Sequence, residues 1–142
     1  MDLYDLNLLF ALVADDHPHH SSVLRWKGNR DGYAFATCSV TEFGLIRLLM
    51  NARLSKNSVN GIMAVNLIKE IHSNPLHSYL DRLPSVTASG FDEVLQGVRG
   101  YRQVTDAYLI ALAKTNGCKL ATLDRKLLDT FGDEYLELVP TN

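Results

Sequence analysis

The chain has 142 residues, with 14 Lys and Arg against 16 Asp and Glu, and a formal net charge of −2. With 46% hydrophobic residues it can bury one substantial core but not two, so we expect a single domain over residues 1–142. A net charge this near zero provides no overall positive field that would attract a polyanion such as a nucleic acid. Bound cations or local arginines can still make the electrostatic potential positive at one site.

The cysteine pattern and the hydropathy indicate a cytoplasmic protein. Cys38 and Cys118 lie in strand-like segments without a CxxC spacing, which favours buried reduced thiols in a cytoplasmic protein. The apolar N-terminal segment is interrupted by Asp5, and no basic region precedes it, unlike a signal peptide. No segment approaches the roughly 20 apolar residues that cross a bilayer, so we predict no membrane span.

Strand and helix patterns alternate along the first half of the chain. Apolar residues at helical spacing follow a short strand signal, so the first strand passes directly into a helix near Asn7. Gly28 and Asn29 end a second helical stretch, after which a strand and an apolar helix follow. In order, the predicted elements are a strand at 3–5, helices from 7 and at 17–26, a strand at 33–37 and a helix at 39–51.

The second half continues this alternation. Nearly continuous apolar character from Ala107 to Ala113 predicts a central helix, which Asn116 and Gly117 close. The predicted elements are helices at 58–71 and 91–96, with a loop and a short strand at 73–85 between them, a basic loop at 97–103, a helix at 105–117, a strand at 118–122, a helix at 124–131 and a strand at 135–139. This series predicts an α/β fold with a mostly parallel sheet.

Four acidic residues lie where strand-like runs meet helical patterns: Asp5, Glu42, Asp106 and Asp124. Because such junctions gather at the ligand-binding edge of a parallel sheet, we expect these carboxylates to lie together. They would repel one another unless a cation lay between them, and Mg²⁺ or Mn²⁺ prefers oxygen ligands of this kind. The sequence therefore predicts a metal-dependent enzyme.

Each acid also has a purely structural explanation. Asp5 and Asp124 follow strands and can cap helices, and Glu42 completes a capping box with Ser39. Asp106 follows a threonine at a helix start, where an acid complements the helix dipole. Four acids at four helix starts exceed what local capping requires, so the joint pattern favours a metal site.

Other chemistries have weaker support. His72 and His77 suggest a zinc cluster, and so do His17, His19 and His20, but no cysteine or spaced partner completes a tetrahedral set. We expect the first three to lie in a polar turn that faces solvent. A Ser-His-Asp hydrolase would need a GxSxG elbow, and nucleotide binding would need GxGxxG or a phosphate loop; none is present.

Three blocks carry a family resemblance: YDLNLLFALV at the N-terminus, TCSVTEFGLIRLL near position 40, and VTDAYLIALAKTNGCKLATLDRKL from 104 to 127. Over almost its whole length the chain resembles the PIN-domain ribonucleases, in particular the VapC-type toxins of bacterial toxin–antitoxin pairs. The resemblance implies a PIN-like three-layer α/β/α fold. It assigns as catalytic and metal-binding residues Asp5, Glu42, Asp106 and Asp124, and as hydrogen-bonding support Asn7 and Thr122.

The same resemblance implies an endoribonuclease that uses Mg²⁺ or Mn²⁺, with a cognate antitoxin and a homodimer as its protein partners. For contacts to RNA, the basic loop offers Arg99, Tyr101 and Arg102, although ordinary solvated charges explain this loop as well. A non-catalytic PIN-like protein or RNA-binding module is the alternative. A signalling receiver domain is disfavoured, because the first strand is followed by DLN and the chain ends in VPTN, which has no lysine.

Overall fold

The computed structural model describes residues 1–54, 56 and 59–142. Within these residues five strands form one sheet in the order β3-β2-β1-β4-β5, and each neighbouring pair is parallel. The strands are β1 (Asp2–Tyr4), β2 (Phe35–Cys38), β3 (His77–Leu80), β4 (Lys119–Thr122) and β5 (Leu136–Leu138). The predicted parallel character of the sheet is confirmed.

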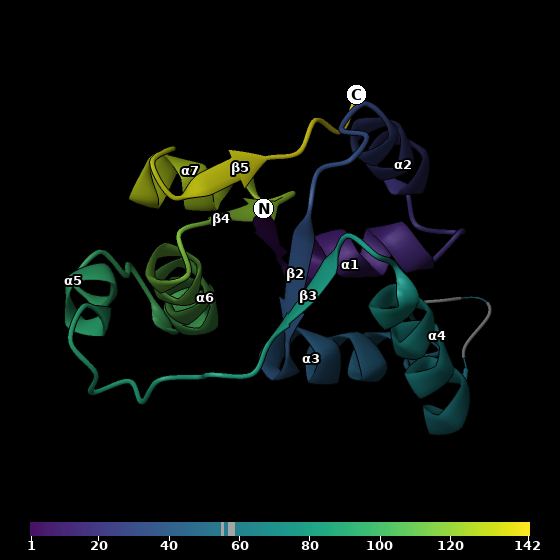
Figure 1. The fold of residues 1–142 in the computed structure, drawn as a ribbon, viewed down its shortest axis with the longest axis horizontal. Coiled ribbons are helices and arrows are strands. Elements are labelled where there is room, and N and C mark those ends of the chain that lie inside the picture. The colour runs from purple at the N-terminus through teal and green to yellow at the C-terminus, as the bar shows by residue number, and fades with distance from the viewer. Residues whose placement is uncertain (55, 57–58) are drawn as a thin grey trace.

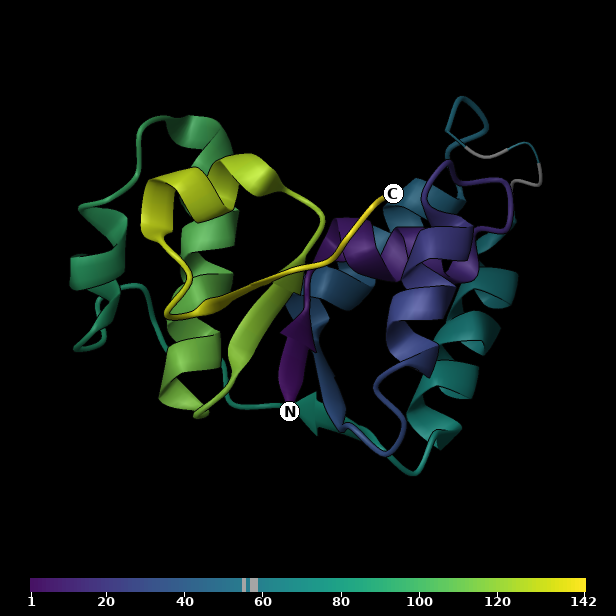
Figure 2. The same ribbon diagram turned by 90° about the horizontal axis from the view of Figure 1, so that it is seen from above.

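The helices cover both faces of this sheet. They are α1 (Leu6–Val13), α2 (His20–Gly28), α3 (Ser39–Leu49), α4 (Gly61–Ser73), α5 (Phe91–Leu95), α6 (Val104–Thr115) and α7 (Arg125–Phe131), with a 3-10 turn, η1, at Tyr101–Gln103. Figures 1 and 2 show α1 to α4 on one side of the sheet and α5 to α7 on the other. The predicted three-layer α/β/α arrangement is therefore confirmed. None of the helices in the described ranges has the length and apolar character of a membrane span.

Two hydrophobic clusters fill the spaces between the layers. Since neighbouring side chains of a strand point to opposite faces, Leu3 and Leu120 join the cluster beneath α6, whereas Tyr4 and Ala121 join the cluster beneath α1. The α6 helix buries Ala107 and residues 109–113, as the apolar run predicted. This central helix is held between the sheet and α5, so its position is fixed by packing along most of its length.

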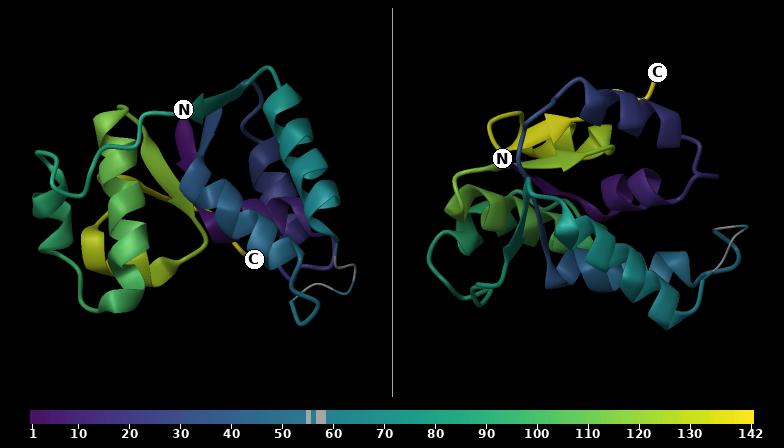
Figure 3. Two further views of the ribbon diagram at one scale, coloured as in Figure 1. Left: turned by 90° about the horizontal axis from the view of Figure 1, so that it is seen from below. Right: turned by 45° about the vertical axis from the view of Figure 1, so that its right-hand side comes forward.

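The segment predicted as loop with a short strand forms the edge of the sheet. Strand β3 pairs with β2 over its full length, from Phe35 opposite His77 to Cys38 opposite Leu80. Residues 81–90 then cross to α5 on the other side of the molecule (Figure 3). Helix α4 begins at Gly61, where the Asn60 side chain accepts from the backbone N–H of Met63 at 2.9 Å. The predicted helix start at Ser58 lies outside the described residues.

Two predicted helix caps are wrong. Cys38, not Ser39, is the N-cap of α3, and its N–H donates to the Thr41 hydroxyl at 3.3 Å. Helix α6 begins at Val104 after η1, and its N-cap Gln103 makes no side-chain capping bond, so Thr105 does not cap this helix. In both cases the helix begins earlier in the sequence than the predicted caps at Ser39 and Thr105 imply. Glu42 therefore does not take part in the capping box, and its carboxylate makes other contacts.

Candidate active site

Asp5 lies directly after β1 and is only 3% exposed. Its Oδ1 accepts from the backbone N–H of Leu6 at 2.7 Å, which caps α1, and its Oδ2 accepts from the Thr122 hydroxyl at 2.7 Å. Burial raises the pKa of Asp5, and these two hydrogen bonds oppose that increase. Both carboxylate oxygens are thus held in place where the strand ends.

Thr122 connects two of the predicted aspartates. Besides donating to Asp5, its hydroxyl accepts from the backbone N–H of Asp124 at 3.1 Å. The Oδ1 of Asp124 accepts from the Lys126 N–H at 2.8 Å and so caps α7. Because β1 and β4 pair in register up to Tyr4 opposite Ala121, Asp5 and Thr122 follow on adjacent strands at the same edge.

Asp106 lies in the first turn of α6 and is half-buried. Its pKa is raised to about 6, first by burial and then by the negative charges of Asp5 and Asp124. Helix α6 runs toward the start of β4, so its first turn lies at the edge where β1 and β4 end. The three aspartates therefore form one electrostatic cluster, although they come from three separate stretches of sequence.

Glu42 has a different set of contacts. Its Oε1 accepts from the Thr37 hydroxyl at 2.6 Å and lies 2.5 Å from Nε2 of His72. The charges that raise the pKa of Asp106 come from Asp5 and Asp124. The charges of three of the four predicted carboxylates thus act on one another, and the fourth, Glu42 in the first turn of α3, contacts a threonine and a histidine.

Capping and clustering occur together at this edge. Asp5 and Asp124 cap their helices, as their structural explanation predicted. Their negative charges also raise the pKa of Asp106. Three carboxylates with one pKa near neutrality are costly without a positive charge. The amino ends of α1 and α6 at this edge offset part of that cost. The all-oxygen donor set is one that suits a hard divalent cation such as Mg²⁺ or Mn²⁺.

The basic loop leads directly into α6, a few residues before Asp106. Tyr101 is 81% exposed, and its hydroxyl accepts from Nε of Arg102 at 3.3 Å. Gln103 attaches the loop to α7, since its Nε2 donates to the Thr130 hydroxyl at 3.2 Å and its Oε1 accepts from the N–H of Arg99 at 3.0 Å. No sequence pattern singles out Gln103, because this role depends on the packing of α7 against the loop.

Two other predicted positions are also placed. Asn7 is exposed in the first turn of α1, two residues after Asp5. The prediction that the histidines at 17, 19 and 20 face solvent is corrected, because all three are half-buried. His20 Nδ1 lies 2.8 Å from the carbonyl oxygen of Ala11, and the ring of His17 packs edge-on against Phe10. These side chains therefore support the end of α1.

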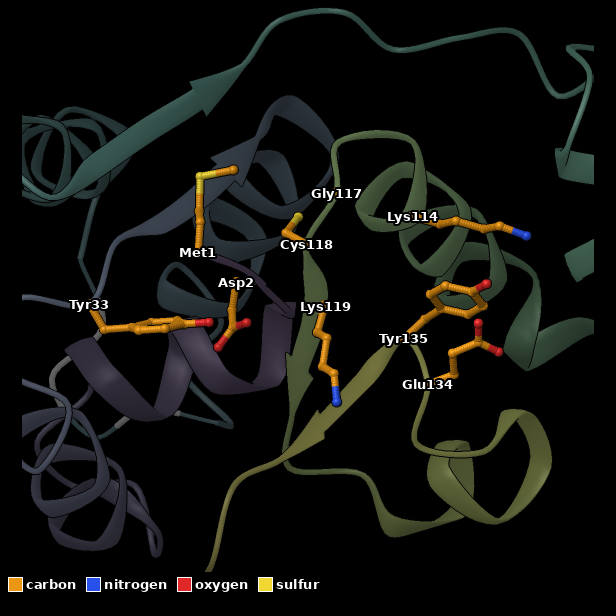
Figure 4. A pocket seen from close by; sticks show the side chains of 9 residues that line it. All are labelled: Met1, Asp2, Tyr33, Lys114, Gly117, Cys118, Lys119, Glu134 and Tyr135. Atoms are coloured by element: carbon orange, nitrogen blue, oxygen red, sulfur yellow. The ribbon is translucent and has the colours of Figure 1, made fainter.

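Figure 4 shows a hollow at the opposite edge of the sheet, where β1 and β4 begin. Asp2 Oδ2 in its wall lies 2.8 Å from Nη1 of Arg30, an ionic contact whose angle is unsuitable for a hydrogen bond. Lys119 donates to the carbonyl oxygen of Asp133 at 3.0 Å. Because these charged groups are partnered within the chain, the hollow is a weaker candidate than the aspartate cluster.

The PIN domain family matches residues 3–132. The chain therefore belongs to this family, as the resemblance predicted. It is similar to "Ribonuclease VapC29" of Mycobacterium tuberculosis, with 35% identity over 139 residues, or 98% of this chain and 96% of that protein. "Ribonuclease VapC38" of the same organism is 32% identical over 124 residues, covering 87% and 85%. "Ribonuclease VapC39" is 31% identical over 138 residues, covering 96% and 98%.

Proposed function

We propose that the protein is an endoribonuclease toxin of a toxin–antitoxin pair, which hydrolyses RNA phosphodiester bonds with the help of Mg²⁺ or Mn²⁺. The observation that carries this proposal is the cluster of Asp5, Asp106 and Asp124 at the edge of a parallel sheet. Membership of the PIN domain family and the relatives named ribonucleases support the same function.

Asp5, Asp106 and Asp124 would hold the divalent ion. Such an ion, when bound, lowers the pKa of a coordinated water and stabilises charge on the leaving oxygen. Thr122 fixes the orientation of Asp5, and the buried position of Asp5 limits the water around it. Asp106, with its raised pKa, exchanges a proton near neutral pH, so acid competes with the ion for its carboxylate.

Glu42 would be the fourth carboxylate of the site. It lies in the first turn of α3, a helix that follows β2 just as α1 follows β1. Its Oε1 contacts Thr37 and His72, so an ion bound by this oxygen would compete with those two partners. Asn7, exposed near Asp5, would supply a hydrogen-bonding amide for the substrate.

Arg99, Tyr101 and Arg102 would bind the RNA strand near the cluster. They immediately precede α6, and thus lie a few residues before Asp106. Arginine contacts the phosphates, whereas the exposed tyrosine ring can stack on an unpaired base. These local cations offset a net charge of −2 that would otherwise repel RNA.

An apolar surface on α3 and α4 is suited to the protein partners. Phe43 of α3 and Val65 of α4, which are 65% and 41% exposed, line one hollow together with Tyr79 of β3. We assign this surface to the homodimer or to the cognate antitoxin, because exposed apolar patches of this kind commonly mark protein contacts.

A non-catalytic PIN-like protein is the second candidate. The observation that favours it is that Oε1 of Glu42 is already engaged by Thr37 and His72. In that case the cluster would be an inert set of caps. The two functions differ in whether the aspartates are needed for RNA cleavage.

The deciding experiment is cleavage of a mixed, structured RNA pool with Mg²⁺ or Mn²⁺, and with EDTA in parallel. Asp106→Asn removes a charge with little change in volume, so we expect cleavage to fall at least about a hundredfold. The matched control is Asp129→Asn, an exposed aspartate of α7, which should cleave like the wild type. Wild-type cleavage by a folded Asp106→Asn protein would refute the proposal.

A further inference from the structure

A second group of potential metal ligands lies beside α3, α4 and β3. The side chains of Glu42, His72 and His77 come from these three elements, and one ligand atom from each lies within 4.8 Å of the others. In the part of the chain that the structure describes, this is the one group of three or more His, Cys, Asp or Glu side chains that converges so closely. The sequence indicated no third ligand for the two histidines, and Glu42 supplies one.

The two histidines are positioned by a tightly bonded turn. His72 lies in the last turn of α4 and His77 begins β3, five residues later. Within the turn, the side chain of Asn74 accepts from the N–H of Leu76 at 2.9 Å, and its backbone carbonyl accepts from the N–H of His77 at 2.9 Å. The imidazole rings stack at 4.5 Å between centroids. Both rings therefore lie next to Glu42 in an arrangement fixed by the backbone.

Thr37 supports this group from the sheet. Its fully buried hydroxyl donates to Oε1 of Glu42 at 2.6 Å and lies 2.7 Å from Nε2 of His77. Hydrogen-bonding groups of this kind hold ligand side chains in position around metal ions. The side chains of Glu42 and His72 remain 15% and 38% exposed, so an ion can reach them from solvent.

The donor types select a class of ion. Two imidazole nitrogens and one carboxylate oxygen suit borderline ions such as Zn²⁺, whereas Mg²⁺ prefers oxygen ligands alone. Ligands about 2.0–2.1 Å from a tetrahedral zinc ion lie roughly 3.3 Å apart, so the present spacing needs only small side-chain adjustments. Three protein ligands leave a fourth position open.

We propose that Glu42, His72 and His77 form a binding site for Zn²⁺ or a similar transition-metal ion, which none of the three clustered aspartates helps to form. The site shares Glu42 with the proposed ribonuclease site, so the two compete for this carboxylate. Zn²⁺ binding still does not depend on the ribonuclease function, because Asp5, Asp106 and Asp124 take no part in it. The site differs from the aspartate cluster in its nitrogen ligands and so in the metal it selects.

The test is Zn²⁺ affinity, measured by competition with a chromophoric chelator in excess Mg²⁺, together with the visible absorption of bound Co²⁺. We expect His72→Ala and His77→Ala each to weaken Zn²⁺ binding at least about tenfold and to lose the Co²⁺ bands. His19→Ala is the matched control, since His19 lies away from the group, and it should bind like the wild type. Circular dichroism verifies that each variant is folded.

Asp106→Asn separates the two sites. If the proposal is correct, this variant binds Zn²⁺ with wild-type affinity even if it no longer cleaves RNA. Two results would overturn the proposal: wild-type Zn²⁺ affinity in both His72→Ala and His77→Ala, or loss of Zn²⁺ binding in Asp106→Asn. The first would leave the group as a hydrogen-bonded network, and the second would place the ion among the aspartates.

Discussion

Asp106→Asn should stabilise the metal-free protein at neutral pH. The pKa of Asp106 rises from 3.8 to about 6 because of burial and the charges of Asp5 and Asp124. A tenfold change in proton affinity corresponds to about 1.4 kcal/mol, which gives an upper limit of about 3 kcal/mol for the cost of ionising this group. Since the side chain is only half-buried, solvent screening reduces the expected gain to about 1–2 kcal/mol.

The sign of the pH dependence follows from the direction of this shift. Because the folded state binds the Asp106 proton more tightly than the unfolded state, the contribution of Asp106 to stability falls as pH rises from about 4 through about 6. The asparagine variant lacks this titration. The stability difference between variant and wild type should therefore grow between pH 5 and pH 7 and level off above pH 7.

Urea unfolding in EDTA at pH 5, 6, 7 and 8 measures this difference, with Asp129→Asn as the control for loss of an exposed aspartate. A second series with Mg²⁺ or Mn²⁺ should reverse the order, because an ion that binds only the folded wild type stabilises it. If Asp106→Asn is less stable than the wild type in EDTA at pH 8, or if the difference does not change with pH, the electrostatic explanation of this cluster is wrong.

Three further predictions concern neighbouring contacts. Thr122→Val removes a hydroxyl that donates to buried Asp5, so it should lower the free energy of unfolding by about 1–3 kcal/mol, whereas Thr105→Val on the exposed side of α6 should have little effect in the same urea titration. Arg102→Ala should weaken RNA binding and reduce the slope of log affinity against log salt by about 1. The control Arg25→Ala on α2 should change neither quantity. Equal slopes for Arg102→Ala and the wild type would show that Arg102 does not contact RNA phosphates. Arg30→Ala leaves the buried Asp2 carboxylate without its ionic partner and should cost about 2–3 kcal/mol by thermal or urea unfolding, and a cost near zero would contradict the role of this pair.

The sequence predicted the fold well where one residue pattern dominates. The apolar run at 107–113 predicted a helix buried on most sides, and α6 has that position. Aspartates at strand ends were informative because parallel strands bring their carboxyl ends to one edge, which is how Asp5 and Asp124 come to act on Asp106. These features depend on local pattern and on a general rule of topology.

The position of Glu42 could not be predicted in the same way. Its contacts depend on β3, which pairs with β2 and brings His77 beside Thr37, forty residues away in the sequence. The short, half-exposed strand gave only a weak signal, and the capping box pattern suggested a local partner for Glu42 instead. Tertiary packing decides which of several nearby groups a side chain contacts, and this cannot be read from the pattern of a single sequence.

Titration of Mn²⁺ into the wild type, Asp106→Asn and Asp129→Asn at pH 7.5, followed by electron paramagnetic resonance of the free ion, tests the aspartate site most directly. The account predicts that Asp106→Asn binds Mn²⁺ at least about tenfold more weakly than the other two proteins. Equal binding by all three proteins would contradict it, because the charges that converge on Asp106 would then not belong to a cation site.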